Sequence, residues 1–203
     1  MKYLSLTKLL LSALLLLSPL AHAEKTILVF GDSLSAGYGI AREAAWPQLL
    51  QTELQQKQAH YSVVNASIAG ETTAGGVRRI AAALTQHKPD IVIVELGGND
   101  GLRGSPLTEM RKNLSIIIIA ALHSGAKVLL VGMRLPPNYG KSYVQQFQDS
   151  YPKLAKKHRV SLLPFLLDGV GPTQFQADNL HPVAEAQPLL LNNVMRSLQP
   201  LLK

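Results

Sequence analysis

Ser33, Asp178 and His181 have the side chains and the sequence neighbours that nucleophilic catalysis needs. Ser33 follows an apolar run at residues 27–30 and a glycine, where we expect a buried strand to turn sharply into a helix. Asp178 lies three residues before His181, a spacing that can place its carboxylate beside the imidazole Nδ1. Such a carboxylate holds the tautomer and stabilises the imidazolium that forms when a serine loses its proton. The three residues therefore suit the roles of nucleophile, orienting group and base.

Each of these residues also has a purely structural interpretation. Ser33 could cap the helix that follows it, as serines after strands commonly do. An Asp-x-x-His sequence before a helix is often only a capping or solvated pair. Catalysis becomes the better interpretation because two glycine-bearing loops are expected at the same edge of the sheet.

Those two loops offer hydrogen-bond donors for a developing oxyanion. Gly70 can present a backbone N–H with no side chain in the way, and Asn99 offers a side-chain amide. Together with the Ser33 N–H they make a three-donor oxyanion hole. Asn99 could instead stabilise its own turn. We interpret Asp32 and Asp100 as structural, with Asp32 pointing away from the serine hydroxyl.

The expected elements bring these residues to one place. Apolar runs typical of strands alternate with helical periodicity throughout residues 24–203, which indicates one α/β domain with a mostly parallel sheet and helices on both faces. Ligands bind at the carboxyl ends of the strands of such a sheet. The expected strands are residues 27–30, 61–65, 90–96, 127–132 and 160–165. The expected helices are residues 43–58, 107–123, 141–158 and 184–198, together with one that Thr72 or Thr73 caps and Pro89 closes.

The loop at residues 133–140 follows the fourth expected strand and is stiffened by two prolines. We expect Leu135 and Pro136 to form a wall of the substrate pocket. Together with the apolar stretch at residues 162–167, they suit an acyl chain better than a sugar.

Residues 1–23 have the pattern of a secretory signal. A basic start is followed by an apolar segment at residues 9–20 and a small-x-small sequence at residues 21–23. The apolar segment is short for a membrane span, which needs about 20 residues. We therefore predict a cleaved signal peptide, a mature domain at residues 24–203 and a periplasmic or secreted protein, with an uncleaved anchor as the alternative.

The composition argues against several kinds of site and partner. The chain has no cysteine, which excludes disulfides, thiolate catalysis and cysteine zinc sites. No metal-ligand spacing and no nucleotide-binding glycine motif occur, so we expect no metal and no cofactor. The net charge of +7 comes largely from scattered basic residues without interleaved aromatics, so we expect no nucleic-acid partner. A mild positive field is compatible with transient contact with anionic lipid.

Four blocks of the sequence resemble the signature blocks of the SGNH, or GDSL, hydrolase family. They are residues 31–35, Gly70, residues 97–100 and residues 178–182, and they occur in the family's order across nearly the whole mature domain. The sequence around them is similar to a bacterial periplasmic subgroup of multifunctional acyl-CoA thioesterases, lysophospholipases and arylesterases.

The resemblance implies a three-layer, flavodoxin-like α/β/α fold with a five-stranded parallel sheet in the order 2-1-3-4-5. It also implies that Ser33 is the nucleophile, His181 the base and Asp178 the group that orients the base. The oxyanion hole would consist of the Ser33 and Gly70 N–H groups and the Asn99 side chain. By the same resemblance the protein is a monomer, and the loop around Leu135 and Pro136 corresponds to the subgroup's mobile acyl-pocket loop. Glu71 replaces a shorter acid, which concerns specificity.

The resulting hypothesis is a serine hydrolase of acyl esters and thioesters, including fatty acyl-CoA, lysophospholipids and aryl esters, that forms an acyl-enzyme on Ser33. Two alternatives stay open at this point. One is a carbohydrate O-deacetylase of the same family with a narrower pocket. The other is a secreted binding module with this fold and no catalysis.

Overall fold

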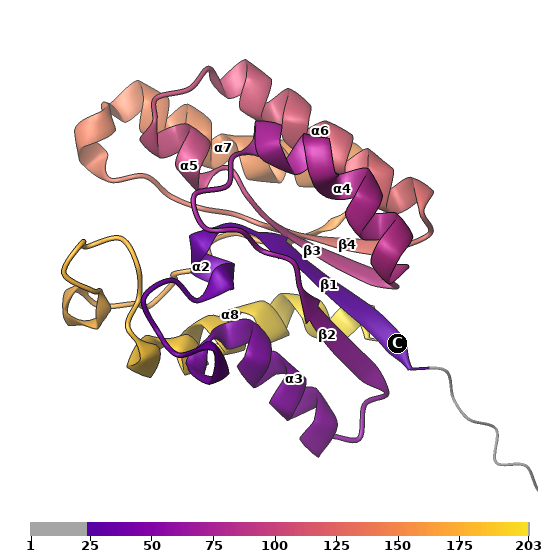
Figure 1. The fold of residues 1–203 in the computed structure, drawn as a ribbon. Helices are drawn as coiled ribbons and strands as arrows, with labels where there is room; N and C mark the ends of the chain where they lie inside the picture. Colours follow the sequence, from indigo (N-terminus) through magenta and orange to yellow (C-terminus); the bar gives the residue numbers. More distant parts are fainter. Residues whose placement is uncertain (1–23, 203) are drawn as a thin grey trace, which may run out of the picture.

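The computed structural model describes residues 24–202. The predicted signal peptide at residues 1–23 lies outside the described residues and stays a prediction. From residue 25 onward, strands and helices alternate and form three layers, with a sheet between two sets of helices (Figure 1).

The apolar runs form a five-stranded parallel sheet. Its strands are β1 (Lys25–Gly31), β2 (Tyr61–Asn65), β3 (Ile91–Glu95), β4 (Lys127–Val131) and β5 (Ser161–Leu163). Their order is β2-β1-β3-β4-β5, which confirms the predicted arrangement. The register aligns Ile27 with Ile91 and Ile91 with Lys127, so the central strands end together. The residues that follow β1 and β3 are thereby brought to the same edge.

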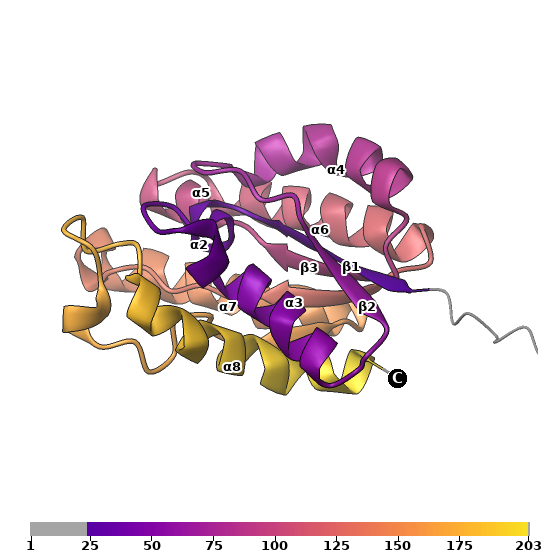
Figure 2. The same cartoon turned by 60° about the horizontal axis from the view of Figure 1, so that its bottom comes forward.

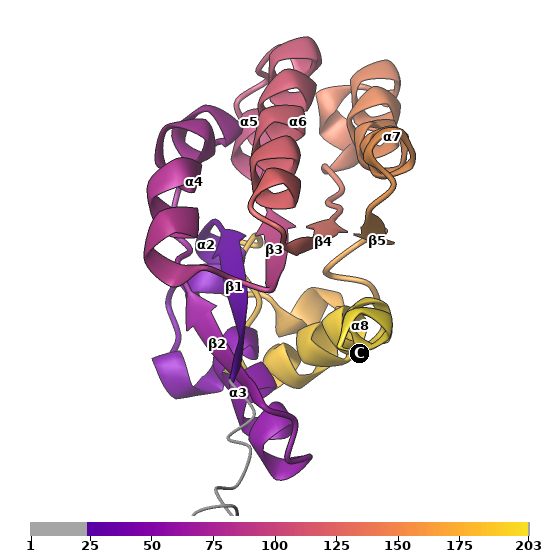
Figure 3. The same cartoon turned by 90° about the vertical axis from the view of Figure 1, so that its right-hand side faces the viewer.

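Helices cover both faces of the sheet (Figure 3). One face carries α4 (Thr73–His87), α6 (Leu107–His123) and α7 (Lys141–His158), and the other carries α3 (Trp46–Gln56) and α8 (Gln187–Leu198). Two short helices, α2 (Ser33–Ala36) and α5 (Gly98–Leu102), begin close after the ends of β1 and β3. Single 3₁₀ turns are η1 (Arg42–Ala44), η2 (Pro137–Tyr139), η3 (Pro172–Gln174), η4 (Ala184–Ala186) and η5 (Gln199–Leu201).

The observed bounds differ from the predicted ones where proline or 3₁₀ geometry intervenes. Helix α3 begins at Trp46 rather than residue 43, because residues 42–44 form a separate 3₁₀ turn and Pro47 stands at the start of the helix. Strand β5 ends at Leu163, because the next residue is a proline and has no N–H for the ladder. Helix α5 begins inside what the sequence predicted to be a loop.

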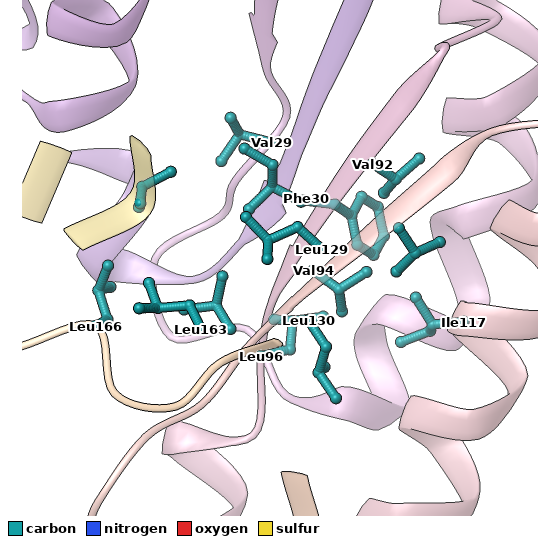
Figure 4. Packing of buried hydrophobic residues seen from close by; sticks show 14 of the residues in the cluster. Val29, Phe30, Val92, Val94, Leu96, Ile117, Leu129, Leu130, Leu163 and Leu166 are labelled. Carbon is teal, nitrogen blue, oxygen red and sulfur yellow. The ribbon is translucent and has the colours of Figure 1, made fainter. Parts of the chain in front are cut away.

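The strands are buried on both faces, as their continuous apolar runs predicted. Leu28, Val29 and Phe30 of β1 have no exposed surface. Figure 4 shows Phe30 on the side of Ile117 in α6, whereas Val29, one residue away, lies on the opposite side of the sheet. Burying a side chain of this size stabilises a fold by about 1.5–3 kcal/mol. This core makes the sheet a rigid support for the loops at its edge.

The segment after β5 returns to the carboxyl edge and lies beside α2 (Figures 1 and 2). An isolated antiparallel bridge joins Phe175 to Pro182 within it. The Gln176 N–H donates to the His181 carbonyl at 2.8 Å, and the Gln176 side chain donates to the Tyr38 carbonyl at 2.8 Å. Residues 175–182 are thus held against the loop that follows α2.

The described part of the chain, residues 24–202, contains no helix with the length and hydropathy that crossing a bilayer requires.

Gly132 allows the end of β4 to pass close to the backbone that follows β5. A Cβ atom at this position would lie 2.3 Å from the Pro164 carbonyl oxygen. We therefore expect Gly132→Ala to lower the free energy of unfolding by about 2 kcal/mol or more in urea titrations.

Gly171→Ala is the matched control for this substitution. Gly171 has a φ of −82°, and the nearest atom to an added Cβ would be 3.6 Å away. It should change stability by less than about 0.5 kcal/mol. Equal stability of the two variants would contradict the packing that we describe.

Candidate active site

Asp32, not Ser33, caps helix α2. The Asp32 carboxylate accepts the Leu34 N–H at 3.1 Å, and Ser33 is the first helical residue. Asp32 thus fills the capping role that the structural interpretation gave to Ser33. Because Gly31 has no side chain, the turn can lie against Glu95, whose Oε2 would be 2.7 Å from an added Cβ.

The structure brings the three predicted residues together from opposite ends of the domain. The Ser33 Oγ lies 2.8 Å from His181 Nε2, and His181 Nδ1 lies 2.6 Å from Asp178 Oδ2. The other Asp178 oxygen accepts the backbone N–H groups of Leu180 at 2.9 Å and His181 at 3.0 Å. These contacts form a continuous chain from carboxylate to imidazole to hydroxyl.

The same contacts determine where the imidazole proton lies. The hydrogen bond from the His181 ring, followed by the two backbone N–H bonds, lowers the pKa of Asp178 to about 2. An ionised carboxylate can only accept, so Nδ1 of the neutral ring carries the proton and Nε2 faces the serine hydroxyl with a lone pair. In this arrangement His181 can take the Ser33 proton.

Tyr38 is a site residue that the sequence did not reveal. Its ring packs against the His181 ring with centroids 4.6 Å apart and planes at 42°. Its carbonyl accepts the hydrogen bond from Gln176 described above. The available signal was its position in the loop that follows the short helix after Ser33.

Two of the three predicted oxyanion donors are backbone N–H groups at the pocket. Ser33 is the first residue of α2, so its N–H has no acceptor within the helix. Gly70 has a φ of +75°, which favours glycine, and within residues 24–202 its N–H has no acceptor. Both residues line the pocket.

The third predicted donor, Asn99, reaches the pocket but already has two acceptors. Its Nδ2 donates to Asp32 Oδ2 at 3.0 Å and to the Glu71 carbonyl at 2.9 Å. The Asn99 side chain thus joins the loops that follow β1, β2 and β3. The structural interpretation had expected it to stabilise only its own turn. An oxyanion in the pocket would have to share one of these N–H groups or replace one acceptor.

The turn that carries Ser33 rests on a buried carboxyl pair, Asp32 and Glu95. Glu95 Oε2 accepts the Ser35 hydroxyl at 2.7 Å and the Asp32 N–H at 3.3 Å. Burial, and then the charge of Asp32, raise the pKa of Glu95 well above its usual value. Burial also raises the pKa of Asp32 to about 6, against the opposing effect of the Leu34 N–H bond. Glu95 therefore holds its proton to a higher pH than Asp32, whose pKa is about 6.

The loop that carries Gly70 is held by charged side chains. Arg79 pairs with Glu71 at 2.7 Å and donates to the Ala66 carbonyl at 2.7 Å, while Arg103 donates to the Gly70 carbonyl at 3.1 Å. Glu71, which we had expected to affect specificity, faces Arg79 and does not line the pocket.

Asp100 has the bracing role that the sequence predicted. Its carboxylate accepts the Thr73 hydroxyl at 2.6 Å and the Thr73 N–H at 2.9 Å. These bonds join the loop after β3 to the start of α4, and so they hold the two glycine loops in register.

A pocket of about 480 Å³ opens beside Ser33 and His181. Leu135 and Pro136 line it, where the sequence placed them. Its other apolar side chains come from the segments that follow all five strands: Leu34, Tyr38, Ala69, Leu102, Met133, Phe165, Leu167, Phe175 and Leu180. Among the described residues no group of three or more acidic or histidine side chains could hold a metal ion. The site therefore combines a serine hydroxyl hydrogen-bonded to an imidazole with an apolar chamber.

This geometry agrees with the comparison to known families. The profile of the GDSL-like Lipase/Acylhydrolase family matches residues 29–187, a range that includes Ser33, Gly70, Asn99, Asp178 and His181. The chain belongs to this family.

Relatives within the GDSL family are similar over almost the whole chain. Esterase TesA of Pseudomonas aeruginosa is 48% identical over 192 residues, which cover 94% of this chain and 95% of the relative. Thioesterase 1/protease 1/lysophospholipase L1 of Escherichia coli K12 is 46% identical over 190 residues, with 93% and 90% covered. A crystal structure of TesA superposes with a TM-score of 0.85 at 47% identity and covers 87% of this chain and 99% of that one.

The neutral state of Glu95 can be tested with Glu95→Gln. In the wild-type protein the unfolded chain loses the Glu95 proton at lower pH than the folded protein, because the folded pKa is raised. The stability of the folded state therefore falls as pH rises above the unfolded pKa. Glutamine has no proton to lose, so the stability of the variant relative to wild type should increase between about pH 5 and about pH 8.

Urea titrations across this pH range provide the measurement, with Glu109→Gln on the exposed surface of α6 as the control. The control should show a much smaller pH-dependent difference. A Glu95→Gln difference that does not vary with pH would mean that Glu95 is ionised in the folded protein.

Proposed function

We propose that this chain hydrolyses acyl esters and thioesters, with Ser33 as the nucleophile. The observation that carries the proposal is the 2.8 Å contact between Ser33 Oγ and His181 Nε2 at the mouth of an apolar pocket. A serine hydroxyl is a weak nucleophile by itself and needs an adjacent base. His181, oriented by Asp178, is such a base.

In this mechanism the Ser33 oxygen attacks the carbonyl carbon while His181 Nε2 takes the hydroxyl proton. The Asp178 carboxylate stabilises the resulting imidazolium. When the tetrahedral intermediate collapses, His181 returns the proton to the departing alcohol or thiol, and the acyl group remains on Ser33. A water molecule, deprotonated by His181, then attacks the acyl-enzyme. As the bond to Ser33 breaks, His181 gives this proton to the Ser33 oxygen, and the carboxylic acid is released.

The negative oxygen of the intermediate is stabilised by the Ser33 and Gly70 N–H groups, with a shared N–H from Asn99. Asp32 acts through Asn99, because its carboxylate holds the amide at 3.0 Å. When ionised, Asp32 also strengthens the hydrogen bond that it accepts from the Asn99 amide.

The pocket supports acyl chains as the substrate class. Its walls are mostly hydrocarbon and aromatic side chains, which gain free energy by covering methylene groups and leave sugar hydroxyls without partners. The names of the relatives, esterase and thioesterase/lysophospholipase, agree with this choice. We therefore propose fatty acyl thioesters, lysophospholipids and aryl esters as substrates in preference to acetylated carbohydrate. From the pattern of residues 1–23 we also propose that the enzyme is exported to the periplasm or secreted. From its resemblance to the family we propose that it acts as a monomer.

A chain-length series tests the substrate class. With nitrophenyl esters from acetyl to palmitoyl, kcat/KM should rise at least about tenfold between acetyl and octanoyl, because each buried methylene contributes about 0.8 kcal/mol. Ser33→Ala should lower turnover by at least about 1000-fold while thermal unfolding stays cooperative.

Ser105→Ala, the same change outside the pocket, should retain activity. A preference for acetyl esters would favour the carbohydrate deacetylase instead. Full turnover by Ser33→Ala would exclude Ser33 as the nucleophile.

A further inference from the structure

Three large apolar side chains are exposed around the pocket mouth. Tyr38 is 53% exposed, Ile68 51% and Leu180 41%. They come from three separate loops, which follow α2, β2 and β5. Tyr38 and Leu180 line the pocket, and Ile68 directly precedes Ala69 and Gly70, which also line it. Single exposed apolar residues are ordinary, but apolar residues that gather at one opening indicate an interaction surface.

The backbone around these side chains is held in place. The Ile68 N–H donates to the Gly31 carbonyl at 3.1 Å, and the Leu180 N–H donates to Asp178 Oδ1 at 2.9 Å. The Tyr38 carbonyl accepts from Gln176, and its ring packs on His181. Since these bonds fix the loops, the side chains are presented to solvent by the fold itself.

Two cationic side chains lie at this opening. Arg103 and Arg134 are both exposed; Arg103 bonds to the Gly70 carbonyl, and Arg134 lines the pocket with its guanidinium 4.5 Å from the Phe165 ring centre. Two carboxylates lie near them: Asp32 is buried, and Asp178, which is 37% exposed, is paired with His181 at 2.6 Å. Cationic groups interspersed with apolar side chains match the headgroup region of an anionic lipid surface.

We propose that Tyr38, Ile68, Leu180, Arg103 and Arg134 form a docking rim that seats the pocket mouth on the surface of anionic phospholipid. The apolar side chains enter the boundary between headgroups and acyl chains, and the arginines contact phosphate groups. A single-chain lipid can then pass from the aggregate into the pocket without crossing water. This inference rests on the proposed function, because it assigns the pocket to acyl chains.

A second exposed apolar group, on α6, provides an internal control. Ile116, Ile119 and Leu122 are 40%, 39% and 37% exposed, and none of them lines the pocket. Helix α6 lies between α4 and α7 on one face of the sheet (Figure 3). Lysines of α6 and α7 are close to Ile116. This face has similar chemistry but no continuity with a substrate pocket, so we assign lipid docking to the rim.

Co-sedimentation with vesicles tests the proposal. The mature protein should bind vesicles of phosphatidylcholine with 30% phosphatidylglycerol at least about fivefold more tightly than vesicles of pure phosphatidylcholine. Ile68→Gln should weaken binding to the anionic vesicles about fivefold or more, because it removes an apolar side chain from the contact. Ile119→Gln, the same change on α6, should leave binding within about twofold of wild type.

Hydrolysis of a short soluble nitrophenyl ester separates this proposal from the proposed function. Both variants should keep wild-type turnover of that ester, since neither residue contacts the triad. If the wild-type protein hydrolyses the ester but does not bind vesicles, or if Ile68→Gln binds them as tightly as wild type, the docking rim is wrong and the proposed function stands. Binding lost in Ile119→Gln would assign docking to α6. Absence of ester hydrolysis would instead overturn the proposed function.

Discussion

The site depends on one hydrogen bond, between a hydroxyl and an imidazole that are 148 residues apart in the sequence. Ser33 stands at the end of the first strand, and His181 lies in the segment that follows the last. Only the parallel arrangement of the sheet brings both to one edge, because every strand then ends on the same side. The buried strands supply the stability that holds this meeting point in place.

The polar groups around the triad hold the loops against one another. Asn99 joins the loops after β1, β2 and β3, and Asp100 makes a second connection between the loops after β2 and β3. Gln176 joins the segment after β5 to the loop after α2. The groups that we propose as oxyanion donors therefore lie on loops that are joined to one another before any substrate binds. This preorganisation is the usual source of electrostatic stabilisation in such sites, since no reorganisation is needed during the reaction. Tyr38, Ile68 and Leu180 are exposed on loops at the same edge of the sheet.

The sequence predicted the sheet and the meeting of Ser33, Asp178 and His181, because both depend on local patterns. A strand buried on both faces needs a continuous apolar run. The three-residue spacing of Asp178 and His181 is enough to place the carboxylate beside the imidazole. The partners of Asn99, the pairing of Asp32 with Glu95 and the packing of Tyr38 on His181 could not be predicted. They depend on the distances between loops far apart in the sequence. The early end of β5 and the separate 3₁₀ turn before α3 depend on proline and local turn geometry, which periodicity alone does not resolve.

Covalent labelling with a fluorophosphonate, followed by mass spectrometry of the peptides, tests the central contact most directly. The reagent should modify Ser33, and Asp178→Asn should slow the reaction by about 100-fold or more, because the imidazole then loses the carboxylate that fixes its tautomer. Asp168→Asn, the same change outside this pocket, should react at the wild-type rate. Labelling of another residue, or an equal rate in Asp178→Asn, would contradict the triad.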